Sequence, residues 1–495
     1  MLPLSIFSVN LLSDNLLLLA SVLVFFAILI TKVGARFGAP SLLLFLILGM
    51  LVGADGLGLT FDDYHVAESI GHFAMTIILF TGGLETSLRE TKPVMKQGAL
   101  LSTLGVLITS LLTALFIYLV AGKWIGPLGA SFLGCFLLSA VMSSTDSASV
   151  FSVLRGKRTH LRENLSPMLE LESGSNDPMA YVLTIILVQV LTSTKNAGSW
   201  ALIGTGAWVL VVQIVVGFLI GLGVGFGAKW ILERVELPSN ALYSVMILSI
   251  GFFANGIASL LYGNGLLSLY VAAIIIGNKV DIPFKRDVLK FFDGMTWLMQ
   301  LLMFLMLGLL ARPSQFSTIA WPALMIGLFM MFIARPLSVF LCLAPFRGIS
   351  AKAKLFASWV GLKGAGPILF ALCPVVAGLN GSSEIFNIVF FITLISLLLQ
   401  GMTLSPAAKW LKLSYDADPD VETFGMEIPD EMGMLRDHTV TEDDLANGET
   451  LRDLHLPHGI RVLMVKRDGR FLVPHGSMPL QPDDHLVIIV GESDD

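Results

Sequence analysis

The sequence predicts a polytopic all-α membrane protein with about 13 transmembrane helices, followed by a small cytoplasmic α/β domain. Three observations support this prediction. Of the 495 residues, 55% are hydrophobic and only 14% are charged, whereas a soluble domain carries about 25% charged residues. The apolar residues form blocks of roughly 20, the length that crosses a bilayer as a helix. Lys-rich and Arg-rich connectors alternate with connectors that are poor in both.

The apolar blocks give the expected spans in chain order. We interpret the first block as a retained span, because it lacks the basic start and the cleavage site of a signal peptide. The expected spans are 14–33, 39–55, 66–84, 98–121, 130–154, 164–193, 201–231, 240–256, 262–278, 288–311, 317–345, 353–378 and 385–411. Composition changes once, near residue 413. Residues 1–413 are therefore the expected transmembrane domain, and residues 414–495 the expected cytoplasmic linker and regulatory domain.

The basic residues predict the orientation in the membrane. Alternate connectors contain 20 Lys and Arg residues, whereas the other set contains only Lys123, Lys195 and Arg312. Basic connectors stay in the cytoplasm. The N-terminus is therefore expected on the periplasmic side and the C-terminal domain in the cytoplasm. Arg335 and Lys363 fall inside spans and need another explanation.

Two pairs of segments indicate an internal repeat. SLLLFLILG (41–49) is similar to SLYVAAIIIG (268–277), and LFTGGL (79–84) is similar to MFLMLGL (303–309). Each pair is seven spans apart, and an odd offset reverses the direction of the chain across the bilayer. Inverted repeats are typical of transporters that work by alternating access.

Two corresponding spans are interrupted by polar or helix-breaking residues. The span 130–154 contains Ser143–Ser147, with Thr145 and Asp146, and the span 353–378 contains Gly361–Pro367, with Lys363. Glycines loosen a helix, and proline removes a backbone donor. Paired interruptions of this kind mark a transporter's binding site, where freed carbonyls favour a cation.

The span 164–193 contains the densest set of polar residues. Ser173 and Asp177 share one helical face, and Glu172 and Asn176 share another. Glu172 needs a basic partner inside the membrane, which Arg335 or Lys363 can supply. We expect the pair Glu172–Arg335, with Lys363 serving the interrupted helices.

The intramembrane charges do not balance. The carboxylates of Asp146, Glu172 and Asp177 outnumber the basic groups of Arg335 and Lys363. A purely structural network would therefore leave one carboxylate unmatched, and a low-dielectric environment disfavours its charged form. A proton or a cation can neutralise it, but not both at once, which predicts exchange of a cation for a proton.

These motifs resemble those of the NhaP-type and sodium/proton-exchanger branch of the monovalent cation/proton antiporters. The similar segments are LESGSNDP (171–178), TDSASVFSVL (145–154), WVGLKGAG (359–366) and ARP (334–336). The resemblance implies that Asp177 binds the ion and the proton, and that Asp146, Ser173 and Thr145 help to coordinate the cation. It also implies that Asn176, Glu172 and Arg335 hold the site. Lys363 departs from the arginine usual in the family, which puts bidentate pairing at this position in doubt.

The resemblance further implies a homodimer, an elevator-like motion of a core domain, and electroneutral exchange. The segment 467–491 resembles the TrkA-C domain found with potassium-uptake systems, which favours potassium as the cation and a bacterial inner membrane as the location. Sodium/proton exchange is the close alternative. The domain is as compatible with a small bound effector as with assembly alone.

Other functions fit the sequence less well. A potassium channel gated by the C-terminal domain would need a TVGYG-type filter, and an aspartyl protease using Asp146 and Asp177 would need a GxGD pattern; both patterns are missing. The net charge of −6 argues against nucleic-acid binding. We expect no enzyme activity and no cofactor. The glycines at 217, 221, 223, 225 and 227 predict helix packing in a span.

Overall fold

The structure is a computed structural model in which two compact units, Met1–Ser414 and Tyr415–Asp495, are distinguished. Each unit is described by itself. The structure describes residues 16–37, 40–156, 159–193, 199–282, 284–416, 435–441, 444–445, 448, 450–454, 460–467, 470–482 and 484–490.

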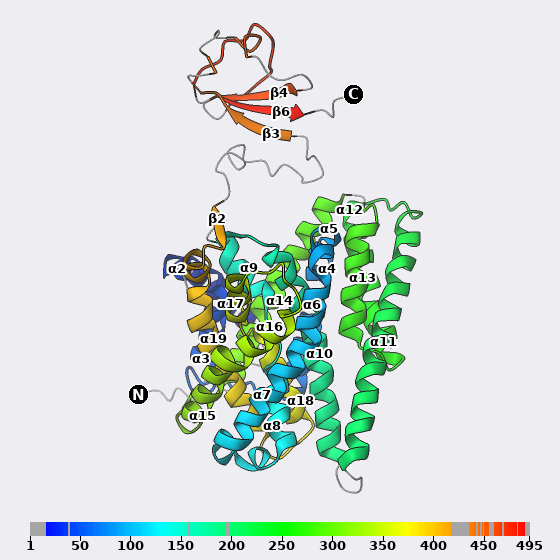
Figure 1. Ribbon diagram of the computed structural model, residues 1–495, viewed down its shortest axis with the longest axis vertical. Helices are drawn as coiled ribbons and strands as arrows, with labels where there is room; N and C mark the ends of the chain where they lie inside the picture. Colours follow the sequence, from blue (N-terminus) through cyan, green and yellow to red (C-terminus); the bar gives the residue numbers. More distant parts are fainter. Residues whose placement is uncertain are drawn as a thin grey trace. The chain divides into compact units, whose positions relative to one another are not determined.

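The first half of the transmembrane unit is mainly helical (Figure 1). The α-helices are α2 (Leu16–Phe37), α3 (Ser41–Val52), α4 (Tyr64–Glu85), α5 (Leu88–Thr91), α6 (Met95–Leu100), α7 (Val106–Phe116), α8 (Phe132–Val141), α9 (Ser147–Gly156) and α10 (Leu165–Ser193). Shorter 3₁₀ or π segments extend them: η2 (Lys92–Val94), η3 (Leu101–Gly105), η4 (Ile117–Ala121), η5 (Gly122–Trp124) and η6 (Gly126–Ala130).

The second half continues in the same way. It contains α11 (Ser199–Leu232), α12 (Asn240–Leu260), α13 (Gly265–Lys279), α14 (Lys285–Leu310), η7 (Pro313–Gln315), α15 (Phe316–Phe329), η8 (Met330–Ala334), α16 (Arg335–Leu343), α17 (Ala351–Trp359), α18 (Ala365–Val376) and α19 (Ser382–Trp410). Strand β1 (Thr159–Leu161) pairs with β2 (Ser414–Asp416). Within the described residues, seven helices or helix runs are long and apolar enough to cross a membrane, and five shorter apolar helices accompany them.

The two predicted interruptions are confirmed. Helix α8 ends at Val141 and α9 begins at Ser147, so the break falls on the polar run that contains Thr145 and Asp146. Helix α17 ends at Trp359 and α18 begins at Ala365, which places Lys363 in the second break. The ends of the α-helices nevertheless differ from the expected spans by several residues, because π and 3₁₀ turns continue some spans beyond the α-helical part.

Glycines mediate close helix contacts at positions that the repeat relates. Gly49 of α3 lies against the backbone of Gly308 in α14, and Gly277 of α13 lies against the backbone of Leu84 in α4. A Cβ at any of these glycines would overlap the opposing backbone. The contact of α3 with α14 and that of α13 with α4 therefore involve helices that the seven-span offset exchanges.

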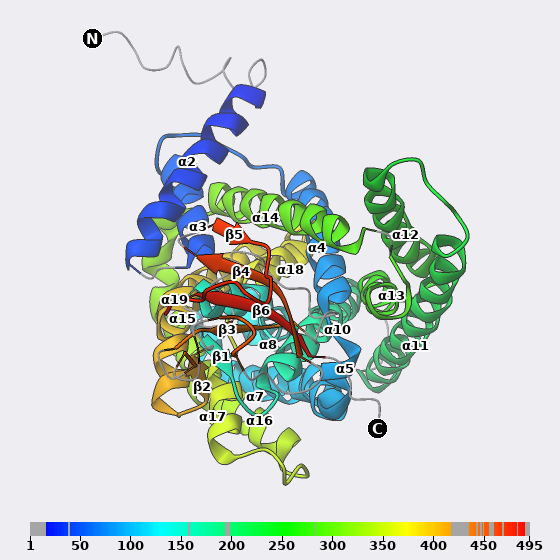
Figure 2. The same ribbon diagram turned by 90° about the horizontal axis from the view of Figure 1, so that it is seen from above.

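The glycines of the span 201–231 have the predicted packing role at three positions. Gly217, Gly221 and Gly225 lie four residues apart on α11, and each one faces α13 or the residue that caps it, Asn264. Viewed from above, α11, α12 and α13 form a group at one side of the unit (Figure 2). The contact is typical of small residues that let membrane helices approach closely.

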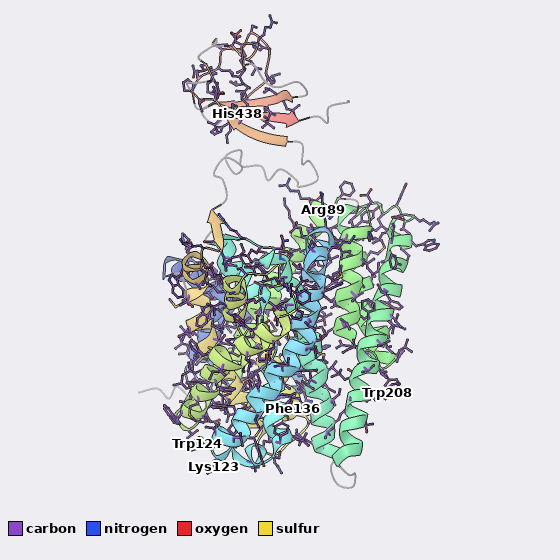
Figure 3. All side chains as sticks on the ribbon, in the orientation of Figure 1. Arg89, Lys123, Trp124, Phe136, Trp208 and His438 are labelled. Atoms are coloured by element: carbon purple, nitrogen blue, oxygen red, sulfur yellow. The ribbon has the colours of Figure 1, made fainter. Side chains whose placement is uncertain are left out.

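Two basic residues, one from each connector set, lie at opposite ends of the transmembrane unit. Figure 3 shows Arg89, from the basic set, at one end and Lys123 with Trp124 at the other. This separation is the arrangement that a chain crossing the membrane repeatedly requires.

The C-terminal unit is built on a four-stranded sheet. The strands are β3 (Leu435–Thr439), β4 (Ile460–Arg467), β5 (Arg470–Leu472) and β6 (His485–Val490). They occur in the order β3-β6-β4-β5, with antiparallel neighbours. Apolar residues on one face, including Val465 and Leu486, form a small core with Val440, Leu454 and Met478. The small sheet-containing C-terminal domain that the sequence predicts is therefore confirmed.

An ion pair closes the end of this sheet. The Arg467 guanidinium donates to both carboxylate oxygens of Asp484, at 2.8 Å and 2.6 Å, and the Asp484 side chain is 1% exposed. Burial raises the pKa of Asp484, but the hydrogen bonds from Arg467 and from the Gln481 backbone outweigh it, so the net pKa is lowered.

We predict that Arg467→Gln destabilises the C-terminal unit by about 1–3 kcal/mol at neutral pH, since Asp484 stays buried without its partner. The folded pKa of Asp484 lies below the unfolded value of about 3.9. The ion pair therefore stabilises the fold above that pH, and the contribution is lost as the pH falls through the folded pKa. Hydrogen exchange of β4 and β6 in the full-length protein should show a variant effect at pH 7 that shrinks toward pH 3. An effect of equal size at pH 7 and pH 3 would contradict this role of the ion pair.

Candidate functional site

The two helix breaks cross each other in the core of the transmembrane unit. The Asp146 N–H donates to the Leu362 carbonyl at 2.9 Å, which joins the first break to the second. Gly364 lies so close to the Asp146 side chain that a Cβ would overlap it. The Lys363 N–H donates to Ser396 Oγ of α19 at 2.9 Å. Backbone N–H and carbonyl groups at the breaks, which lie outside regular helix, thus form hydrogen bonds inside the protein. The membrane interior requires this, because hydrocarbon offers no hydrogen-bond partner.

Asp146 and Lys363 stabilise opposite kinds of helix end at this crossing. Asp146 precedes α9 and accepts hydrogen bonds from Ser149 N at 3.0 Å and Ser149 Oγ at 2.5 Å, in the manner of an N-cap. Lys363 Nζ donates to the Ser144 carbonyl at 2.9 Å, just beyond the end of α8. An acidic group at a helix start and a basic group at a helix end both complement the helix dipole.

Helix α10 fixes the first break through the residues that the sequence selected. Asn176 Nδ2 donates to Thr145 Oγ1 at 2.6 Å, and Ser173 Oγ donates to the Thr145 carbonyl at 2.5 Å. Asn176, Ser173 and Thr145 are all buried. The Thr145 backbone, which the resemblance expects to help coordinate the cation, is therefore held in place from α10.

The structure contains the predicted Glu172–Arg335 ion pair. Arg335 Nη2 lies 2.5 Å from Glu172 Oε1, and the two side chains are 6% and 1% exposed. Gly361 of the second break lies beside Arg335, because a Cβ there would be 3.2 Å from Arg335 Nε. The pair consequently joins α10, α16 and the second break.

Asp177 makes no ion pair among the described residues, although the positive charge of Lys363 acts on it from the second break. Its carboxylate accepts a short hydrogen bond from Ser144 Oγ, and no ion pair in the described part of the chain includes it. The sequence analysis did not include Ser144 among the site residues. The signal that could have found it was its place beside Thr145 in the same polar interruption.

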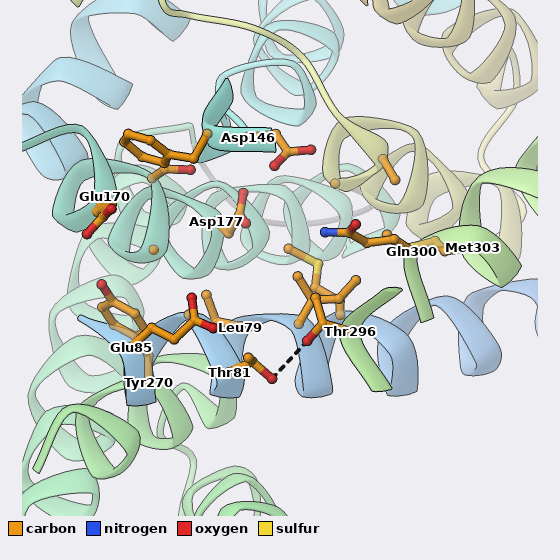
Figure 4. A pocket seen from close by; sticks show the side chains of 18 of the residues that line it. Leu79, Thr81, Glu85, Asp146, Glu170, Asp177, Tyr270, Thr296, Gln300 and Met303 are labelled. Carbon is orange, nitrogen blue, oxygen red and sulfur yellow. Dashed lines mark hydrogen bonds between the residues drawn. The ribbon is translucent and has the colours of Figure 1, made fainter. Parts of the chain in front are cut away.

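Asp177 opens into a cavity of about 640 Å³. The cavity lies between the interrupted helices and α10 on one side and α4, α13 and α14 on the other. Figure 4 shows Asp146, Asp177 and Glu170 on one wall and Glu85 with Thr81 on the opposite wall. Thr296 Oγ1 of α14 donates to Thr81 Oγ1 at 2.9 Å within that wall.

Several cavity residues were missed by sequence reasoning. Glu85, Asp293, Thr296 and Gln300 line the cavity but come from spans far from Asp177 in the sequence. The spacing of these residues within their own helices does not indicate that they lie near Asp177. Only the packing of α4 and α14 against the interrupted helices brings them to the site.

Oxygen atoms dominate the polar lining of the cavity near Asp177. Pro178 has no N–H, so α10 offers no i−4 hydrogen bond to the Gly174 carbonyl, and Gly174 lines the cavity. Carboxylates, hydroxyls and carbonyls suit hard cations. Of the predicted ligands, Asp177, Asp146 and Ser173 all line the cavity, whereas Thr145 lies behind them, held by Ser173 and Asn176.

Comparison with known families agrees with this geometry. The transmembrane domain of sodium/hydrogen exchangers matches residues 21–410, and the TrkA-C domain matches residues 435–494. The chain belongs to the sodium/hydrogen exchanger family. The transmembrane match includes both helix breaks, α10 and Arg335.

Several family members are similar over nearly the whole chain. The K(+)/H(+) antiporter NhaP2 of Shewanella oneidensis is 37% identical, with 96% of this chain and 81% of the relative covered. The K(+)/H(+) antiporter NhaP of Alkalimonas amylolytica is also 37% identical, with 97% and 81% covered. The structure of the sodium proton antiporter MjNhaP1 from Methanocaldococcus jannaschii superposes with a TM-score of 0.65 at 22% identity, covering 79% of this exchanger and 97% of that chain. The exchanger fold is therefore shared.

We predict that Arg335→Ala lowers the stability of the exchanger by about 3–5 kcal/mol, because Glu172 remains buried without a partner. The midpoint of thermal unfolding in detergent measures the effect. The double variant Glu172→Gln/Arg335→Met is the matched control, since it removes both charges and should recover most of the loss. Unchanged stability of Arg335→Ala would show that the pair does not stabilise the fold.

Proposed function

We propose that this exchanger is an electroneutral potassium/proton antiporter that binds one cation or one proton at Asp177. The observation that supports it is the charge balance of the core. Asp146 and Lys363 stabilise the crossing of the breaks, and Glu172 is paired with Arg335. Asp177 makes no ion pair among the described residues and faces the cavity beside Ser144, so its carboxylate is available to a transported ion.

In this mechanism the proton and the cation compete for the same carboxylate. A cation approaching through the cavity meets Asp177 together with Asp146 and Ser173, the other predicted ligands. Ser144 hydrogen-bonds to the ionised form of Asp177 and so helps it to hold a cation. Protonation of Asp177 removes the negative charge and releases the cation. The exchange then requires that the site face the two sides of the membrane in turn.

Potassium is the proposed cation because relatives at 37% identity are named K(+)/H(+) antiporters. Sodium is the second candidate, since the Na(+)/H(+) antiporter NhaH of Halobacillus aidingensis is 27% identical over 56% of this chain. Carboxylate, hydroxyl and carbonyl ligands serve both ions. Transport measurements with each cation distinguish the two.

The proposed setting is a bacterial inner membrane, with the N-terminus in the periplasm and the TrkA-C domain in the cytoplasm. The alternation of basic connectors supports this orientation. We further propose that the exchanger works as a homodimer, with α6–α10 and α15–α19 in the core that moves during transport.

We predict that Asp177→Asn abolishes exchange, because asparagine can neither release a proton nor neutralise a cation. The measurement is proton flux in proteoliposomes under an imposed gradient of potassium, sodium or lithium, with and without a membrane potential. Wild-type flux should respond to potassium and not to the potential. The variant Asp62→Asn, at an exposed ion pair with Arg312 outside the cavity, is the matched control and should keep its flux. Full activity of Asp177→Asn would exclude the mechanism.

We predict that Ser144→Ala keeps exchange electroneutral but raises the cation concentration for half-maximal flux. The lost hydrogen bond stabilises the ionised form of Asp177, and a bond to a charged group contributes about 1.5–3 kcal/mol. An increase of about tenfold or more in the half-maximal potassium concentration is therefore expected. Ser110→Ala, in the same unit but bonded only within the scaffold, is the control. An unchanged value for Ser144→Ala would mean that Ser144 does not influence the carboxylate.

A further inference from the structure

A second cavity, of about 550 Å³, lies outside the ion pathway. It is formed by the membrane-facing parts of η8, α16, α17 and α19, and shares no lining residue with the cavity at Asp177. Its walls are apolar, and the larger side chains among them are Met331, Phe332, Leu355, Trp359 and Trp410. A volume of this size is typical of pockets that bind small molecules.

One wall of this apolar cavity is rigidly held. The Trp359 indole N–H donates to Thr403 Oγ1 at 3.0 Å, and Thr403 Oγ1 donates in turn to the Leu399 carbonyl at 2.6 Å. The Phe332 ring packs against the Trp359 ring with a centroid distance of 5.6 Å. The indole N–H of Trp359 and the hydroxyl of Thr403 are therefore already hydrogen-bonded within this wall. An occupant would contact mainly apolar atoms there.

Three lysines lie close in sequence to residues that line the cavity. Lys352 lies one helical turn before Leu355 on α17, and Lys409 and Lys412 flank Trp410 and Leu411 at the end of α19. All three lysines are exposed, and the Trp410 side chain is 82% exposed. Helical rise places Trp359 about 10 Å deeper than Lys352. The cavity therefore runs from a basic rim into the depth of the bilayer.

We propose that this cavity binds the acyl chain of an anionic phospholipid whose headgroup contacts Lys352, Lys409 and Lys412. The argument rests on complementarity at both ends: an apolar interior for the chain and a basic rim for the headgroup. The rim is at the cytoplasmic surface in the orientation proposed above, where anionic lipids attract clustered lysines. The inference depends on that orientation but not on the ion that the exchanger transports.

The cavity is connected to the ion site by hydrogen bonds. The Trp359 carbonyl accepts a bond from Gln400 Nε2 at 2.9 Å, and Gln400 Oε1 accepts one from Ser396 Oγ at 2.5 Å. Ser396 Oγ is also the acceptor for the N–H of Lys363, in the second helix break. An occupant in contact with Trp359 is thereby linked to the second break, whose Lys363 bonds to the Ser144 carbonyl.

Binding is tested on the full-length protein by native mass spectrometry, with phosphatidylglycerol and phosphatidylethanolamine of the same acyl chains as probes. Wild type should retain phosphatidylglycerol at least about tenfold more strongly. The triple variant Lys352→Gln/Lys409→Gln/Lys412→Gln should lose this preference. The control triple Lys92→Gln/Lys96→Gln/Lys279→Gln removes three exposed lysines from other connectors and should keep it.

A variant that fills the cavity tests the place of the acyl chain. Ala407→Phe should reduce retention of both lipids, with the unfolding temperature reporting on its folding.

Equal retention of the two lipids by wild type, or the same loss in both lysine triples, would overturn the proposal. Asp177→Asn should still bind phosphatidylglycerol, so loss of transport and loss of lipid are separate results. A cross-link from Trp359→Cys to a second copy of the chain would instead identify this face as a subunit contact.

Discussion

The crossing of the two interrupted helices is the constraint on which the rest of the transmembrane unit depends. Each break removes backbone groups from a helix, and hydrocarbon cannot hydrogen-bond to them. The structure satisfies them internally through the bond from Asp146 N–H to Leu362, through the Asp146 cap on α9 and through Lys363 Nζ at the Ser144 carbonyl. The opposite charges of Asp146 and Lys363 therefore both lie at this crossing.

Helix α10 divides its polar residues between support of the crossing and the proposed ion site. Glu172 pairs with Arg335, and Ser173 and Asn176 hold Thr145, so three consecutive contacts fix the crossing against α10. Asp177 follows these residues directly and bonds to Ser144, in the same crossing. The carboxylate is thus held in a fixed position by groups that form no ion pair with it. A short sequence, 172–177, supplies both the support and the proposed ion-binding group.

The sequence predicted what depends on local pattern. Hydropathy located the spans, and the polar runs around Asp146 and Lys363 located the breaks. The need of Glu172 for a basic partner inside the membrane predicted its pair with Arg335. The sequence could not predict residues that join the site only through tertiary packing, such as Glu85 and Gln300. Nor could it show that Asp146 caps α9 as well as facing the cavity, because that depends on where the helix restarts.

The single unmatched carboxylate also constrains how the proposed antiporter can cycle. With Asp177 ionised and empty, the moving core would carry a net negative charge through a low-dielectric region, which is costly. A bound monovalent cation or a proton removes that charge equally well, so both loaded forms can cross and the empty form cannot. Exchange becomes obligatory for this electrostatic reason. Because the two loaded forms have the same charge, the complete cycle moves no net charge across the membrane. A membrane potential therefore does not drive or oppose the exchange.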